Sequence, residues 1–85
     1  MFDKLKQIKQ LKELQASLKK ERVEVERLGV QVIINGGLEV EEITINPSLS
    51  KEEQEKLLVD SINEAIKKIQ VIAAQKMSGI SGFGA

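Results

Sequence analysis

The sequence contains no cysteine and no histidine, and these two absences exclude much of the chemistry that a small protein could carry. Without cysteine there can be neither a disulfide nor a thiolate ligand for zinc. Without histidine the chain lacks the commonest general base and the commonest metal ligand. Tyrosine and tryptophan are also absent, and Phe2 and Phe83 are the only aromatic residues. Single-stranded nucleic acid would therefore find few side chains on which its bases could stack.

Long apolar segments are missing as well. The longest apolar run has only four residues, from Val71 to Ala74, which is far too short to cross a membrane. The first residues also lack the apolar core of a signal peptide. A chain of 85 residues makes one small domain with a marginal core, burying about 60–65% of its unfolded surface. We therefore expect a single domain over residues 1–85, located in the cytoplasm and without a membrane partner.

The formal net charge is zero and the pI is about 6.3, so the whole chain is not a basic domain of the kind that binds nucleic acid. The charge is nevertheless unevenly distributed. Residues 1–20 carry six lysines against two acidic residues, a net of +4, and residues 21–60 carry four basic against ten acidic residues, a net of −6. Residues 61–85 carry three lysines against one glutamate, a net of +2. The ends are basic and the middle is acidic.

The first segment predicts a helix over residues 3–20. Its apolar residues recur every three or four positions with no glycine or proline between them: Leu5, Ile8, Leu11, Leu14 and Leu18. Lysine and glutamine occupy much of the remaining surface. A stripe this narrow is typical of a coiled-coil or two-helix seam rather than of a helix embedded in a core.

Alternation of apolar and polar residues predicts three short antiparallel strands between residues 23 and 45. Asn35-Gly36 predicts a type I′ hairpin turn, because both central positions of that turn need φ > 0. The apolar residues change parity after Val40, which predicts a bulge near Glu41-Glu42. Ile33 faces away from its apolar neighbours, so the second face of the sheet should not be entirely polar.

A long second helix should follow the sheet. Pro47 ends the last strand because it has no N–H for the ladder, and Ser50 with Glu53 forms a capping box. The apolar face of this helix runs to about Met77: Leu58, Ile62, Ala65, Ile66, Ile69, Ile72 and Ala73. The glycine-rich tail, residues 78–85, is expected to be disordered.

The lengths of these elements favour a homodimer. A helix of about 27 residues is about 40 Å long, whereas strands of six or seven residues cover only about 20–23 Å. Part of the apolar helix face is therefore left over, and three short strands leave two open sheet edges. A second copy would cover both. The alternative is a monomer whose second helix frays at its end.

The order helix, three strands, long helix, with "VQVIINGGLEVEEITINPSL" from Val30 to Leu49 at its centre, resembles the YbaB/EbfC family of bacterial nucleoid-associated proteins. Asn46-Pro47 stands where the family often has Asp-Pro. Asn63-Glu64-Ala65, followed by Lys67-Lys68, stands where the family usually has Asn-Asp-Ala. The segment between Leu49 and Asn63 looks about one turn shorter than in the family, which would change how far the second helix projects.

The resemblance implies an α+β fold that forms a homodimer through its strand region and projects its helices as a pair of arms. It also implies binding of double-stranded DNA with low sequence specificity, in the nucleoid, with effects on chromosome organisation and gene expression. The residues expected at the dimer contact are Val30, Val32, Ile33, Ile34, Ile43 and Ile45. The residues expected to meet DNA are Lys4, Lys6, Lys9, Lys12, Lys19 and Lys20, with smaller contributions from Lys67, Lys68 and Lys76.

Two other interpretations of the same residues remain open. The helix lysines can be a solvated face that keeps a marginal protein in solution, and the leucine seam can hold a protein partner instead. An enzymatic interpretation has no residue to support it, since the serines have no histidine to activate them and "NGG" is not part of a phosphate-binding loop. We expect no cofactor and no metal.

Overall fold

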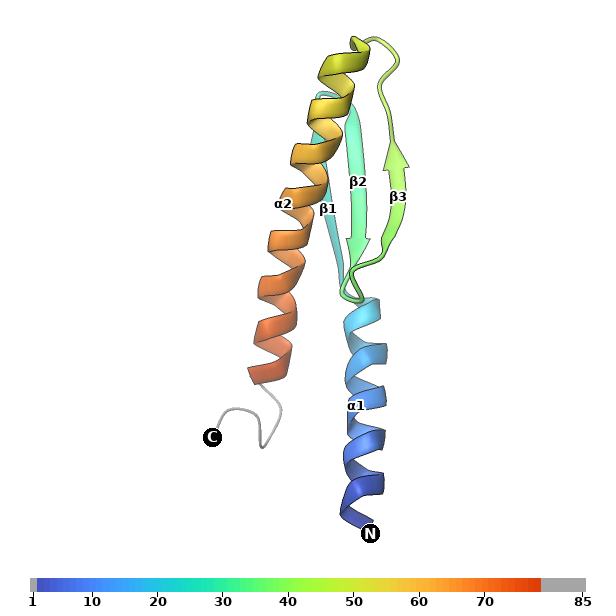
Figure 1. Ribbon diagram of the computed structural model, residues 1–85, viewed down its shortest axis with the longest axis vertical. Coiled ribbons are helices and arrows are strands. Elements are labelled where there is room, and N and C mark those ends of the chain that lie inside the picture. The colour runs from blue at the N-terminus through green and yellow to red at the C-terminus, as the bar shows by residue number, and fades with distance from the viewer. Residues whose placement is uncertain (1, 79–85) are drawn as a thin grey trace.

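A computed structural model describes residues 2–78 and confirms the predicted order of elements (Figure 1). The elements are α1 (Phe2–Lys20), β1 (Arg22–Arg27), β2 (Val30–Asn35), β3 (Val40–Thr44) and α2 (Lys51–Ser78). Both helices begin and end within a residue of the predicted bounds. The predicted disorder of the tail lies outside the described residues from residue 79 onward, while Ser78 is the last residue of α2.

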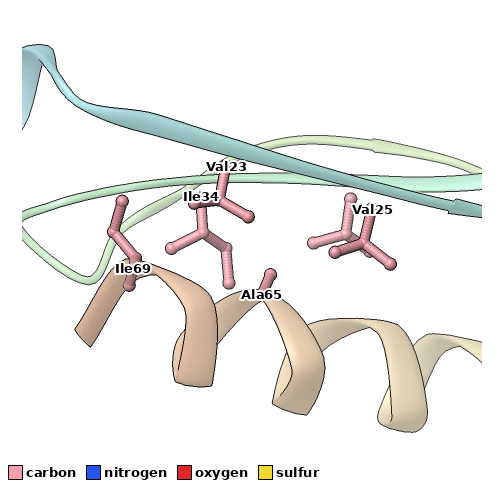
Figure 2. Packing of buried hydrophobic residues seen from close by; sticks show 6 residues of the cluster. Val23, Val25, Ile34, Ala65 and Ile69 are labelled. Atoms are coloured by element: carbon pink, nitrogen blue, oxygen red, sulfur yellow. The ribbon is translucent and has the colours of Figure 1, made fainter. Parts of the chain in front are cut away.

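The three strands form one antiparallel sheet in the order β1-β2-β3, and α2 packs across one face of it. The pairs Val25–Val32 and Val23–Ile34 place four apolar side chains on the face that α2 covers. Ala65 and Ile69 meet them from the helix, as Figure 2 shows. The contacts of α2 are with β1 and β2, so the core lies under these two strands and β3 extends beside it.

The predicted bulge is present in β3. Ile33 stands opposite Glu42, but the next residue, Ile34, stands opposite Val40, so Glu41 is the extra residue. The bulge turns the Glu41 carboxylate toward Arg22, whose Nε lies 2.8 Å from it. The bulge accounts for the change of parity in the apolar residues of this strand.

The predicted type I′ turn at Asn35-Gly36 is wrong. Among the described residues, positive φ angles occur at Leu28 (51°), Gly29 (83°) and Leu38 (60°). Arg27 pairs with Val30, so Leu28 and Gly29 form the two-residue connection between β1 and β2. Two central residues with φ > 0 are typical of a type I′ turn. Sequence reasoning missed it because leucine is an unfavourable first residue for such a turn.

The connection between β2 and β3 is instead a three-residue loop closed by Asn35. Its N–H donates to the Glu39 carbonyl at 3.0 Å, and the N–H of Leu38 donates to the Asn35 carbonyl at 3.0 Å. The Asn35 side-chain oxygen accepts from the N–H of Gly37 at 2.8 Å and of Glu39 at 3.2 Å. A turn followed by one residue with φ > 0 is a common three-residue hairpin. Asn35 thus serves as a hydrogen-bond acceptor, not as a residue with φ > 0.

The start of α2 is fixed by the predicted capping box and by Asn46. The Ser50 hydroxyl accepts from the N–H of Glu53 at 3.2 Å and donates to its carboxylate at 2.9 Å. The Asn46 amide donates to the carbonyl of Leu28 at 2.8 Å, and its own N–H donates to the side chain of Gln54 at 2.7 Å. Asn46 therefore joins the β1–β2 turn to the first turn of α2. An aspartate could not make the bond to the Leu28 carbonyl, because its side chain has no N–H to donate.

Candidate nucleic-acid interface

Helix α1 projects beyond the end of the sheet as an arm, and we call residues 2–20 the α1 arm (Figure 1). The described chain is accordingly elongated, measuring 58 × 20 × 15 Å. None of residues 3–20 is buried, and only Leu14, Ser17 and Leu18 are half-buried. The arm is thus attached to the body through its last turns, and the rest of it is open to solvent.

Six lysines on the α1 arm are exposed: Lys4, Lys6, Lys9, Lys12, Lys19 and Lys20. Lys6, Lys9 and Lys12 follow one another at three-residue spacing, so consecutive members are neighbours on the helix surface. Lys19 lies 3.9 Å from a Glu39 carboxylate oxygen, and both side chains are more than half exposed. Within residues 3–78 the other five have no carboxylate within salt-bridge distance. The structure therefore leaves their charges available to a ligand.

The three lysines predicted on α2 differ from one another. Lys67 is exposed. Lys68 pairs with Glu64 at 3.3 Å, and Arg27 donates to the same carboxylate. These two donors lower the pKa of Glu64, with Arg27 the larger cause. Lys76 is only half-exposed and contacts the base of the α1 arm. The spacing of Glu64 and Lys68, four residues apart on one helix, is compatible with an ion pair. Spacing along the helix does not show that Arg27 joins this pair or that Lys76 meets Glu21, because those partners come from other segments.

Most acidic residues lie in the sheet, in the segments that border it and in α2, whereas the α1 arm carries only Asp3 and Glu13. Glu24 and Glu42 flank Ile33 on the face opposite α2, as their pairing across the sheet requires. In Figure 1 all three strands lie above α1, and the C-terminal end of α1 meets the lower end of the sheet. The α1 arm therefore presents a net positive charge to a long polyanion that approaches it.

The residues predicted at the dimer contact lie in different environments within one chain, and the contact itself stays a prediction. Val30, Val32 and Ile34 have at most 1% of their surface exposed and lie within the subunit's own core. These three side chains have no surface to offer to a second chain, because α2 already covers them. Alternation along β2 correctly placed them on one face, but the sequence did not show which strands the helix would cover.

Within the sheet, the large apolar residues that remain exposed lie in β3. Val40 and Ile43 stand opposite Ile34 and Val32, so they share the face on which α2 packs. They nevertheless remain 47% and 46% exposed, because α2 lies over β1 and β2 instead. Ile45, directly after β3, is 52% exposed. Ile43 and Ile45 were predicted as contact residues, and Val40 adds to the same exposed strip.

In residues 2–78, neither helix is apolar enough over a sufficient length to cross a membrane. The same residues contain no cluster of side chains with the composition of a metal site. Both arginines are paired with carboxylates, Arg22 with Glu41 and Arg27 with Glu64.

Fold and surface together define a small α+β protein in which a basic helical arm is attached to a body with an acidic sheet face. The chain belongs to the YbaB/EbfC DNA-binding family, whose model matches residues 1–84. A nucleoid-associated protein of Nitrobacter hamburgensis is 32% identical over 95 aligned residues, which cover 96% of this chain and 90% of that protein. A nucleoid-associated protein of Rhodopseudomonas palustris strain HaA2 is 30% identical with the same coverage.

A nucleoid-associated protein of Caldicellulosiruptor saccharolyticus is 36% identical over 59 residues. This match covers 65% of the chain and 52% of that relative, so it spans about half of the relative's length. The resemblance seen in the sequence is thus confirmed, and the family is a DNA-binding one rather than a family of enzymes.

Proposed function

We propose that this protein binds double-stranded DNA in the nucleoid as a homodimer, with low sequence specificity. The observation that carries the proposal is the α1 arm, which projects beyond the sheet and carries six exposed lysines. The family and the names of the nucleoid-associated relatives support DNA as the ligand. Effects on chromosome organisation and gene expression would follow from this binding.

The charge of the arm suits a duplex. The α1 arm carries six lysines against Asp3 and Glu13, a net of +4, and a dimer would present twice that. Duplex DNA offers one negative charge per roughly 1.7 Å of its axis, and lysines near it release condensed counterions. Lys67 adds charge from α2, while Lys68 and Lys76 contribute less because each already contacts a carboxylate of its own chain.

Low specificity follows from which cations are available. Lysine places a point charge on phosphate and does not select bases, whereas arginine reads guanine through two parallel hydrogen bonds. Arg22 and Arg27 are both engaged with glutamates of the body. The cations of the arm are all lysines. Contacts should therefore be made mostly to the DNA backbone.

Two features support dimerisation. One is the exposed apolar strip that consists of Val40 and Ile43 in β3 and Ile45 directly after it. The other is the pair of open sheet edges at β1 and β3. Removing this strip from water would contribute roughly 25 cal/mol for each Å² buried. A dimer should have a mass of about 19 kDa by light scattering, twice the 9.4 kDa of one chain. Ile43→Glu should dissociate or unfold it, because an unpaired charge would be buried.

The matched control for Ile43→Glu is Thr44→Glu, which adds the same charge to the next residue, on the opposite face of β3. Thr44→Glu should leave the dimer intact if the α2 side of the strand forms the contact. Dissociation by Thr44→Glu alone would place the contact on the face that carries Ile33. A folded monomer at micromolar concentration in the unmodified protein would contradict the dimer itself.

The decisive experiment for DNA binding is a salt series with short duplexes of unrelated sequence. The triple variant Lys6→Gln, Lys9→Gln, Lys12→Gln should weaken binding by similar factors on all of them while the protein stays folded. If all six positions of a dimer touch phosphate, the slope of log K against log salt should fall by about 5 in magnitude. An unchanged slope with intact binding would move the interface elsewhere, with Lys67 on α2 the first candidate.

A second candidate function is a protein-interaction module, and one observation favours it. Leu5, Ile8 and Leu11 are 65%, 51% and 49% exposed, so the leucine seam of the α1 arm is uncovered along much of its length. An apolar stripe at helical spacing fits the face of another helix. Absence of duplex binding even at low salt, with capture of a specific protein that Leu11→Glu abolishes, would favour this function over DNA binding.

A further inference from the structure

The base of the α1 arm is held from two sides. On one side the loop between β2 and β3 packs against its last turn. The N–H of Gly36 donates to the Glu21 carbonyl at 3.0 Å, and a Cβ at Gly36 would lie 2.1 Å from the Leu18 carbonyl oxygen. The loop and the end of the arm are thus in close contact, with no room for a side chain between them.

On the other side Lys76 of α2 makes polar contacts with the end of the arm and with the residue that follows it. The Lys76 ammonium donates to the Ser17 hydroxyl at 2.6 Å and lies 3.1 Å from a Glu21 carboxylate oxygen. The bond between Lys76 and Ser17 joins residues 59 positions apart, near the C-terminal ends of the two helices. Figure 1 shows the lower part of α2 beside the top of α1. Among the described residues, α2 continues for only two residues past Lys76.

Resting on the proposed function, we propose that Lys76 is a positioning residue, which fixes the direction of the α1 arm and so sets DNA affinity without contacting phosphate. An ammonium has three donors, and two of them are directed at Ser17 and Glu21. Its charge is balanced by the Glu21 carboxylate. Lys76 therefore differs from five of the six exposed lysines of the arm, all except Lys19, whose charges have no such partner among residues 3–78.

Because the arm is long, a small rotation at this junction moves its tip by a large distance. Nineteen residues at about 1.5 Å each make a helix of about 28 Å. A rotation of about 20° at its base would move its tip by about 10 Å, which is comparable with the Debye length at physiological salt. Lysines displaced by that distance would interact only weakly with phosphates. Loosening the junction should therefore reduce affinity although every arm lysine is still present.

The test is the effect of Glu21→Gln on duplex binding, for which the two possible roles of Lys76 predict opposite results. Glu21→Gln removes a negative charge beside Lys76. If Lys76 bound phosphate, releasing it from Glu21 would strengthen duplex binding. If Lys76 positions the arm through Glu21, the variant should weaken binding by about threefold or more, the lower end of what coupled neighbours show. Ser17→Ala should weaken binding in the same direction without any change of charge.

The matched control is Glu13→Gln on the α1 arm, at an exposed position without an ion pair among the described residues. It should strengthen binding slightly, since its effect is electrostatic alone. Weaker binding by Glu21→Gln beside stronger binding by Glu13→Gln supports the proposal. Equal strengthening by both variants overturns it, and a larger strengthening by Glu21→Gln overturns it and makes Lys76 a phosphate contact.

A second measurement does not depend on DNA. Because the chain has no cysteine, spin labels can be placed at Gln10→Cys in α1 and Gln70→Cys in α2, with labelled chains diluted into unlabelled protein. Lys76→Met and Glu21→Gln should broaden the distance distribution, and Lys76→Arg, which keeps the charge and several donors, should restore it. Unchanged distributions overturn the positioning role. If the unmodified protein binds no duplex, the proposed function fails, while these distances still decide whether Lys76 fixes the arm.

Discussion

The body, β1–β3 with α2, and the α1 arm use their apolar residues in opposite ways. All seven buried hydrophobic residues among the described ones lie in the body, and six of them, from β1, β2 and α2, form one cluster. The arm has a comparable apolar stripe, but Leu5 and Ile8 are more than half exposed. Stability is therefore concentrated in the body, whereas the arm carries the available positive charge. Substitutions in the two regions should consequently affect different measurements.

The largest expected effect comes from truncating the same side chain in each region. Ile69→Ala removes a residue that is 1% exposed and should lower the free energy of unfolding by about 2–5 kcal/mol. Ile8→Ala removes one that is 51% exposed and should change it by less than about 0.5 kcal/mol. Urea melts of both variants at one protein concentration make the comparison. A large loss in Ile8→Ala would mean that a second chain covers the arm and that the two regions are not independent.

The next effect concerns the junction between the two regions. Gly36→Ala should destabilise the protein by about 1–3 kcal/mol, because the new Cβ would lie 2.1 Å from the Leu18 carbonyl oxygen and the loop or the arm must shift. Gly37→Ala is the control, since its nearest neighbours would be two side chains at 3.2 Å or more. Thermal melts of the two variants test the contact. Equal melting temperatures would show that the loop does not press on the arm.

Gly36 also shows how far sequence reasoning reached. Hydrophobic period, the Ser50–Glu53 cap and the parity change near Glu41 predicted the helix bounds, the three strands and the bulge, because each depends on neighbouring residues. The turn was misassigned, since Asn35-Gly36 is the stronger type I′ signal although Leu28-Gly29 has the positive φ angles. The glycine requirement at residue 36 arises from a helix 18 residues earlier in the chain, which local patterns do not reveal.

The same distinction holds for the candidate interface. The lysines of the α1 arm could be predicted because a helix of known charge pattern exposes them whatever it packs against. The pair Glu64–Lys68 is also local, since the two residues are four apart on one helix, but the partners of Lys76 could not be inferred from spacing. For Lys76 they are Ser17 and Glu21, and the contact depends on how two distant helix ends meet. The uncovered strip of β3 was also missed in part, because alternation gives the face of a strand but not the position of the covering helix.

Within the body, Ser61 is a position at which a substitution should increase stability. It is fully buried in α2, and its hydroxyl has no hydrogen-bond partner among the described residues. Ser61→Ala should raise the free energy of unfolding by about 1 kcal/mol, because an unsatisfied hydroxyl is costly to bury and Ala favours the helix. Ser48→Ala, at an exposed loop position, is the control. A loss of stability in Ser61→Ala would show that the hydroxyl has a partner in solution.

A smaller gain is expected at the β1–β2 turn, at the end of the body far from the arm. Leu28 has φ of 51° and is 69% exposed, so its side chain gains little burial while its backbone is strained. Leu28→Asn would create Asn-Gly, the favoured type I′ pair, and should stabilise by about 0.4–1 kcal/mol. Leu28→Ala keeps the unfavourable φ and should not stabilise. Equal gains in both variants would mean that removing the exposed leucine, not relieving the backbone, causes the effect.

The smallest effect depends on pH and belongs to the ion pairs of the body. Arg27 and Lys68 hold the pKa of Glu64 below its ordinary value of 4.5. A carboxyl whose pKa is lower in the folded state contributes stability that is fully present above its unfolded pKa. That contribution disappears as the pH falls through the lowered folded value. Melting temperatures measured against pH for the unmodified protein and Glu64→Gln should therefore differ most near neutrality and converge in acid.

Arg27→Gln should show part of the same convergence, because it removes the larger cause of the shift and leaves Lys68 in place. The effect must be small, since Glu64 lies at the surface, where solvent screens the interaction. DNA affinity of both variants should remain unchanged, because neither residue belongs to the arm. A constant difference in melting temperature at all pH values would mean that Glu64 contributes through packing alone. A change in DNA affinity would show instead that charges of the body influence the arm, and the separation of the two regions would be incomplete.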